Sequence, residues 1–111
     1  LRGALTQRVL QRVGADPEIA RSGYLAGILV VLQALLRQPA HLMAADLDLG
    51  EVIYNAVRDR SGPMGEALAV VERLRGSDRL EADPVVNGVR LDVNSLYGDE
   101  SEVTREVIDQ F

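Results

Sequence analysis

The chain contains no cysteine and no lysine, and it has a single histidine. Without cysteine, disulfides, thiolate metal sites and cysteine nucleophiles are excluded together. Without lysine, a Schiff-base enzyme and a P-loop are excluded, because each depends on a lysine amine. All twelve basic residues are arginine. The missing residue types therefore remove several large classes of enzyme before any motif is considered.

Charge limits the partners further. The formal net charge of −5 repels a phosphate backbone, so the sequence predicts no nucleic-acid partner. A helix-turn-helix over residues 52–71 is also disfavoured, because its second helix would begin GPMGEALAVV and offers no polar side chains to read base edges.

The longest uncharged apolar run, from Tyr24 to Leu36, has thirteen residues and lies between Arg21 and Arg37. A membrane-spanning helix needs about 20 apolar residues, and a run of roughly 10–14 is more typical of a buried helix. No small-residue cleavage pattern follows the run, so it is not a signal peptide. We therefore expect a buried helix and no membrane partner.

Size and composition indicate one globular domain. The chain has 111 residues, of which 47% are hydrophobic and 26% charged, a balance typical of folded rather than disordered proteins. The absence of cysteine fits a reducing compartment, and we expect a cytoplasmic protein. The chain lacks an initiator methionine and Phe111 ends an apolar stripe at the last residue, so we expect a piece of a longer protein.

Helix-start and helix-stop signals recur along the first 78 residues. Gly14 is placed as a C-terminal cap, and Asp16 followed by Pro17 predicts a helix running to about Arg37. A short helical segment, AHLMAADL, follows Pro39. The fold class predicted is an all-α, compact helical bundle of about five to six helices.

Two further helices are predicted before residue 78. Asp48 and Glu51 have the spacing of a capping box. The helix that they open has an apolar face of Val52, Ile53, Ala56 and Val57. The next helix begins near Pro63, buries Met64, Leu68, Val71 and Leu74, and ends at Gly76.

The segment 79–111 has weaker periodicity than the bundle of residues 1–78. Asn87-Gly88 marks a turn, and we expect an irregular connection there in preference to a hairpin. Asp99 and Glu102 predict the start of a last amphipathic helix packed on the same domain. Its apolar side would carry Val103, Val107, Ile108 and Phe111.

No cluster of residues forms a convincing active site. His41 lacks a second histidine or a cysteine with which to bind zinc, so a solvent-facing or capping role is expected. Glu102, Glu106 and Asp109 could bind a hard cation, but such charges are usually a solvated helix face. We predict no catalytic residue, no cofactor and no metal.

Three stretches follow one another along the chain: Gly27 to Leu36, Leu47 to Val57, and Gly62-Pro63-Met64-Gly65. Together they resemble the C-terminal part of the HDOD domain found behind EAL domains in bacterial signalling proteins. Their order and spacing match the family pattern of an apolar helix, a leucine-rich acidic turn, a helix and a G-x-x-G segment. The resemblance covers roughly residues 5 to 78.

The resemblance also accounts for the apolar run. HDOD domains are similar to HD-type metal phosphohydrolases, in which a His-Asp pair on this helix binds metal. Val30 and Val31 stand at those two positions, and aliphatic side chains cannot coordinate a cation. The resemblance implies a non-enzymatic signal-transduction domain that acts by protein contact or dimerisation and is linked to cyclic-di-GMP signalling.

Two hypotheses follow. The first is a module that pairs with itself or with a neighbouring signalling domain, through a surface near Leu42, Met43, Leu47 and Met64, where methionines make adaptable contacts. The second is a residual small-ligand or metal-binding, hydrolase-like pocket that uses Asp46, Asp48, Glu51 and Arg58.

Overall fold

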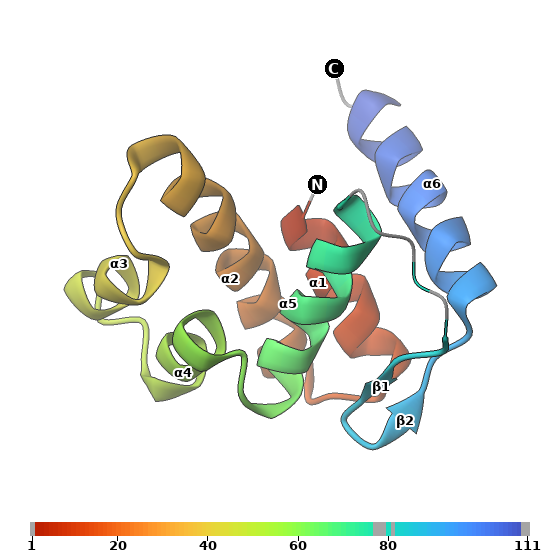
Figure 1. Cartoon of the computed structure of the whole chain (residues 1–111), viewed down its shortest axis with the longest axis horizontal. Coiled ribbons are helices and arrows are strands. Elements are labelled where there is room, and N and C mark those ends of the chain that lie inside the picture. The colour runs from red at the N-terminus through yellow and green to blue at the C-terminus, as the bar shows by residue number, and fades with distance from the viewer. Residues whose placement is uncertain (1, 77–79, 81, 110–111) are drawn as a thin grey trace.

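Six helices and one short hairpin make up the described part of the chain (Figure 1). The computed structural model describes residues 2–76, 80 and 82–109, with side chains up to Glu106. In chain order the elements are α1 (Arg2–Arg12), α2 (Pro17–Leu36), α3 (Ala40–Asp46), α4 (Glu51–Asp59), α5 (Gly62–Arg75), β1 (Val85–Val86), β2 (Val89–Arg90) and α6 (Val93–Asp109). The predicted all-α bundle is confirmed.

Local signals set the ends of α2. The Asp16 carboxylate accepts a hydrogen bond of 2.9 Å from the backbone N–H of Glu18, and Pro17 is the first helical residue. This arrangement satisfies one of the free N–H groups at the start of the helix. Arg37 ends α2 in a left-handed conformation, with φ of 55°. Both ends agree with the sequence prediction.

The start of α4 differs from the prediction. Gly50 is the residue before α4, with φ of 94°, and no side chain caps the helix. The backbone N–H of Leu49 still bonds to the Ala44 carbonyl of α3 at 3.1 Å, so Asp48 belongs to the turn that ends α3. The predicted capping box of Asp48 and Glu51 is therefore wrong.

The inner faces of α4 and α5 largely follow their patterns. All four residues predicted to face inward from α5 are buried, and Gly76 ends that helix. On α4, Ile53, Ala56 and Val57 are buried, but Val52 lies on the outside. The stripe on α4 is thus one residue narrower than predicted.

A small hairpin forms where an irregular connection was expected. Val85 pairs with Arg90 and Val86 with Val89 in an antiparallel ladder. Asn87 and Gly88 both have positive φ, 53° and 72°, as the tight two-residue turns favoured in hairpins require. Val86 is fully buried, so its packing against the helices fixes the hairpin in spite of its irregular flanks.

The last helix begins earlier than predicted. α6 starts at Val93, and Asp92 accepts a hydrogen bond of 3.1 Å from the backbone N–H of Asn94. Asp99 consequently lies inside the helix and is not its cap. Val103 is buried as expected. The side chains of Val107 and Ile108, and all of Phe111, lie outside the described residues.

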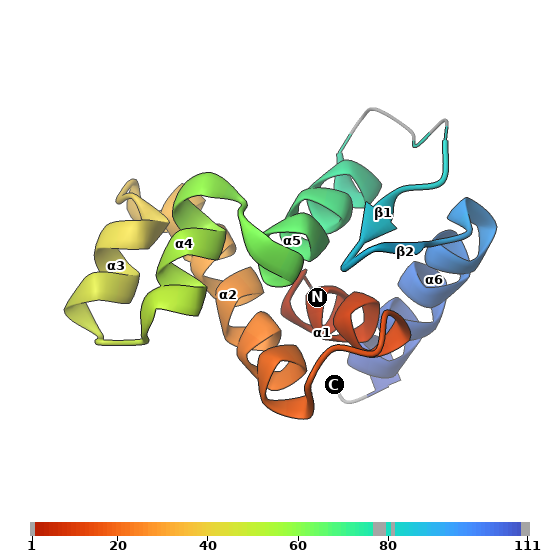
Figure 2. The same ribbon diagram turned by 90° about the horizontal axis from the view of Figure 1, so that it is seen from below.

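The core lies where α1 meets its neighbours. Figure 2 shows α1 between α2 and α6, with α5 alongside. Side chains from all four helices are completely or almost completely buried: Leu5, Leu10, Leu29, Met64 and Leu96. The radius of gyration is 13.3 Å, as expected for a compact domain of this length. Such a compact globule is compatible with a soluble protein.

Candidate interaction surface

Helix α2 has one side packed inside the protein and another side left in water. Its buried residues are Ala20, Gly23, Ala26, Gly27, Leu29 and Val30. On the other side lie Tyr24, Ile28, Val31 and Leu35, which are 45%, 37%, 36% and 73% exposed. Because these four are spaced by four, three and four residues, they form one stripe along the helix. We call this stripe the α2 face.

The α2 face is wide and carries no charge. Between Arg21 and Arg37 the chain has no charged residue, and half-buried Leu25 and Leu32 lie along one edge of the stripe. The four residues of the α2 face leave on the order of 400 Å² of apolar surface in water, the size at which a patch on a monomer commonly marks a contact site. In Figure 2, α2 lies on the outside of the molecule between α1 and α4.

Small residues explain why this helix buries the side that it does. A Cβ atom added to Gly27 would lie 2.6 Å from the Cα of Gly3, and one added to Gly3 would lie 2.6 Å from the Tyr24 carbonyl oxygen. The backbones of α1 and α2 therefore cross in contact at the two glycines. This close crossing keeps the glycine side of α2 inward and turns Tyr24, Ile28, Val31 and Leu35 outward.

The whole apolar run from Tyr24 to Leu36 was predicted to be buried, and that prediction is wrong for about half of its residues. Val30 is buried in the core, but Val31 beside it belongs to the exposed α2 face. A signal for this was present in the sequence. The glycines and most of the alanines of α2 fall on one side, whereas Tyr24, Ile28 and Leu35 recur at heptad spacing on the other.

The surface expected near Leu42, Met43, Leu47 and Met64 is divided by the structure. Leu42 and Leu47 are exposed, in agreement with a surface role. Met43 is buried against the bundle and Met64 lies in the core, so neither can contact a partner. Both methionines fill interior space, the more common role of that side chain.

A polar cleft of about 720 Å³ lies beside the C-terminal ends of α2 and α4. Arg58 lies over the Tyr54 ring at 5.0 Å and donates hydrogen bonds of 2.9 and 2.6 Å to Asp59. These bonds from Arg58 lower the pKa of Asp59 below its ordinary value. Arg60 donates to Glu72 at 2.6 Å and to carbonyl groups at the end of α4.

The cleft is therefore explained without a ligand. Arginines favour helix C-termini, where they neutralise free carbonyl groups, and both Arg58 and Arg60 already have carboxylate partners. His41 is half-buried and meets the Tyr54 ring edge-on, with ring centroids 5.8 Å apart. It packs against an aromatic ring and stays partly exposed, which agrees in part with the solvent-facing role expected.

The alternative pocket of Asp46, Asp48, Glu51 and Arg58 gains no support from the geometry. Asp46, Asp48 and Glu51 are all exposed, and Arg58 is bonded to Asp59. Among the residues that the structure describes, no group of three or more histidine, cysteine, aspartate or glutamate side chains could hold a metal ion. That the chain is not an enzyme stays a prediction.

A second, more apolar cleft of about 370 Å³ lies between the start of α2, the start of α5 and the hairpin turn. Asp16 and Asn87 line it, together with Ile19, Val52 and Met64. The Asp16 carboxylate caps α2, and the Asn87 amide donates to the Val13 carbonyl at 3.4 Å. These polar groups serve the fold, and the cleft offers no set of free groups aimed at one ligand.

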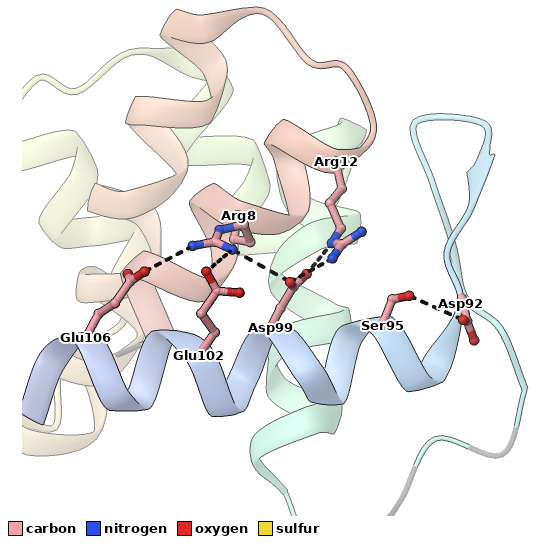
Figure 3. Close-up of polar contacts among 7 residues, drawn as sticks. All are labelled: Arg8, Arg12, Asp92, Ser95, Asp99, Glu102 and Glu106. Atoms are coloured by element: carbon pink, nitrogen blue, oxygen red, sulfur yellow. Dashed lines mark hydrogen bonds and ion pairs between the residues drawn. The ribbon is translucent and has the colours of Figure 1, made fainter.

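The acidic residues of α6 face two arginines of α1 (Figure 3). Arg12 donates through Nε and Nη2 to both carboxylate oxygens of Asp99, the second bond being 2.8 Å long. Arg8 lies 3.7 Å from Asp99, 3.5 Å from Glu102 and 3.7 Å from Glu106. The bond to Asp99 raises the pKa of Arg12 above its ordinary value. These carboxylates therefore hold α6 on α1; the side chain of Asp109 lies outside the described residues.

Helix α2 is 20 residues long, longer than the uncharged run that the sequence analysis considered. By length and composition alone it could cross a membrane, and a third of its most apolar window is buried inside the protein. The length of α2 therefore does not exclude a membrane-spanning helix, although α1, α4 and α5 pack on it.

Comparison with known proteins adds no relative. No family model, no curated protein and no solved structure matches the chain.

Proposed function

We propose that this chain is a non-enzymatic helical module that acts by protein–protein contact through the α2 face. The observation that carries the proposal is the exposed stripe of Tyr24, Ile28, Val31 and Leu35 on a helix with no charge between Arg21 and Arg37. Single exposed apolar residues are common, but four on one continuous helix face are not.

The apolar area of the α2 face indicates what kind of surface the partner must present. Covering on the order of 400 Å² at about 25 cal/mol per Å² contributes on the order of 10 kcal/mol. Association itself costs roughly 4–15 kcal/mol in lost motion. The apolar contribution and the cost are thus similar, so a polar partner surface would not bind. The partner must present a complementary apolar face.

The resemblance to HDOD domains supplies the biological setting of the proposal. It supports a role in relaying signals inside a larger bacterial regulatory protein linked to cyclic-di-GMP. Protein contact, and not catalysis, is the function expected where Val30 and Val31 stand in place of metal ligands. A cytoplasmic location belongs to the same proposal.

Photo-crosslinking in cells tests this function. A benzophenone amino acid placed at Tyr24 of the full chain should form adducts with protein, because Tyr24 lies on the α2 face. The same group placed at Leu47, which is more exposed than Tyr24 but lies after α3, serves as the control and should still give far fewer adducts. Equal adduct yields at the two positions, or none at Tyr24, would rule out the α2 face as the contact surface.

A further inference from the structure

We infer that the partner of the α2 face is a second copy of this chain, with the two α2 helices side by side and antiparallel. This inference rests on the proposed function and names its partner. It is drawn from three properties of the face: its spacing, the charges at its ends and its area.

The spacing of the four residues along the stripe is the same in either chain direction. Tyr24, Ile28, Val31 and Leu35 are separated by four, three and four residues. A two-fold axis placed between Ile28 and Val31 puts Tyr24 opposite Leu35 of the other copy, and Ile28 opposite Val31. This is the alternation of large apolar side chains that a coiled-coil seam needs. Two-fold symmetry also requires one patch to match itself, which this pattern does.

The end charges favour the antiparallel arrangement over the parallel one. Glu18 and Arg21 lie at the start of α2 and Arg37 at its end, and all three are exposed. A parallel pair would place each of these charges beside its own copy. In the antiparallel pair Arg37 of one chain lies opposite residue 22 of the other, close to Arg21 and about one turn from Glu18, so one repulsive and one attractive contact at each end replace the three like-charge contacts of the parallel pair. Antiparallel helix dipoles also attract each other.

The area of the face indicates how stable the pair is. A standard stable interface buries about 800 Å² from each partner, whereas the α2 face offers about half of that. The pair should therefore dissociate on dilution, as small transient interfaces do.

A lipid surface is the competing occupant of the α2 face. Because α1, α4 and α5 pack on α2, the helix could not enter a bilayer without leaving the bundle, whereas pairing with a second copy leaves the fold unchanged.

Disulfide trapping tests the arrangement directly, because the chain has no cysteine of its own. One variant carries Tyr24→Cys and the other, distinguished by a size tag, carries Leu35→Cys. In the antiparallel pair the two thiols face each other, so the mixed dimer should form under mild oxidation. Two copies of the same variant hold their thiols about 16 Å apart, eleven residues at 1.5 Å each, so the mixed dimer should form at least about ten-fold faster than either like dimer.

Three outcomes overturn the inference. Like dimers that form faster than the mixed dimer would mean a parallel pair. Cross-linking no faster than that of a Leu47→Cys control would mean that α2 does not pair with itself. The third outcome is binding to lipid: the protein stays monomeric and floats with neutral phosphatidylcholine vesicles, and Ile28→Glu abolishes this flotation. That result would assign the α2 face to lipid. Circular dichroism checks that every variant is folded.

The two proposals can fail separately. If the benzophenone at Tyr24 captures a different protein while the cysteine pair stays unlinked, the contact function stands and self-pairing is rejected. If it captures no protein, both are rejected. Capture of the same chain together with a fast mixed disulfide supports both.

Discussion

Helix α1 is joined to two of its neighbours, α2 and α6, by opposite kinds of contact. Towards α2 it presents Gly3 and apolar side chains, and the two backbones touch where Gly3 meets Gly27. Towards α6 it presents Arg8 and Arg12, which reach the carboxylates of that helix (Figure 3). The first contact depends on shape and the second depends on charge.

The two contacts should respond differently to change. Backbone contact leaves no room for adjustment, since interiors are close-packed and tolerate little added volume. Loss of one partner of an ion pair costs little stability where water can solvate the charge that remains. The Asp99 side chain is 4% exposed but that of Arg12 is 41% exposed, so only one end of this pair is buried. Three predictions test the contrast, and the largest effect comes first.

Adding one methyl group at the glycine crossing should destabilise the fold strongly. The Cβ of Gly27→Ala would lie 2.6 Å from the Gly3 Cα, so α1 must shift, and we expect a loss of about 1–3 kcal/mol in the free energy of unfolding. Denaturant unfolding measures it.

The same substitution elsewhere provides the control. Gly98 lies within α6, and a Cβ atom added there would meet no other atom within 4 Å. Gly98→Ala should therefore stabilise the protein by about 0.5–1 kcal/mol, as alanine does in helix interiors. If both variants change stability alike, the crossing at Gly27 does not constrain the fold.

Removing the buried carboxylate of the charged contact should have a smaller effect. Asp99→Ala deletes two hydrogen bonds from Arg12, and we expect a loss of about 1–2 kcal/mol because the arginine can turn to water. Glu102→Ala, in the same helix but with an exposed side chain, should cost less than about 0.5 kcal/mol. A cost at Glu102 equal to that at Asp99 would show that burial does not matter to this contact.

The smallest of the three effects is expected from salt, which should weaken the contact between α1 and α6 but not the contact between α1 and α2. At 1 M salt the screening length falls to about 3 Å, compared with about 10 Å at 0.1 M, which weakens the pairs of Arg8 with Glu102 and Glu106. The rate of amide hydrogen exchange in α6 should rise a few-fold, because the free energy of local opening falls by roughly 0.5 kcal/mol. Exchange in α2 should not rise, and a parallel rise there would contradict an apolar α1–α2 contact.

Features set by neighbouring residues were predictable from the sequence. Asp16-Pro17 begins α2 and Gly76 ends α5 because capping involves groups only a few residues apart. The inner face of α5 was also correct, since Met64, Leu68, Val71 and Leu74 follow helical spacing. Six helices in a compact bundle follow from such signals.

Features that depend on distant partners were missed. Asp99 resembles a helix cap in sequence, but its carboxylate bonds to Arg12, 87 residues away. The Asn87-Gly88 hairpin had weak flanks, yet Val86 is buried against the helices and holds it in place. Met43 was placed on a surface because the sequence does not reveal which side of a short helix meets the core. Met64 was placed both on the inner face of α5 and on that surface, and only the inner position agrees with the structure.

The sequence by itself determined that residues 17–36 form a long, apolar helix with small residues on one side and large ones on the other. Hydrophobicity alone would bury the large side chains, because they remove the most apolar area from water. Only the tertiary structure decided the reverse: α1 crosses α2 in backbone contact at Gly3 and Gly27, which only the glycine side of α2 allows. Leu29 and Val30 are buried beside the glycines, but Tyr24, Ile28, Val31 and Leu35 are left outside, and these four form the surface that we propose a second copy covers.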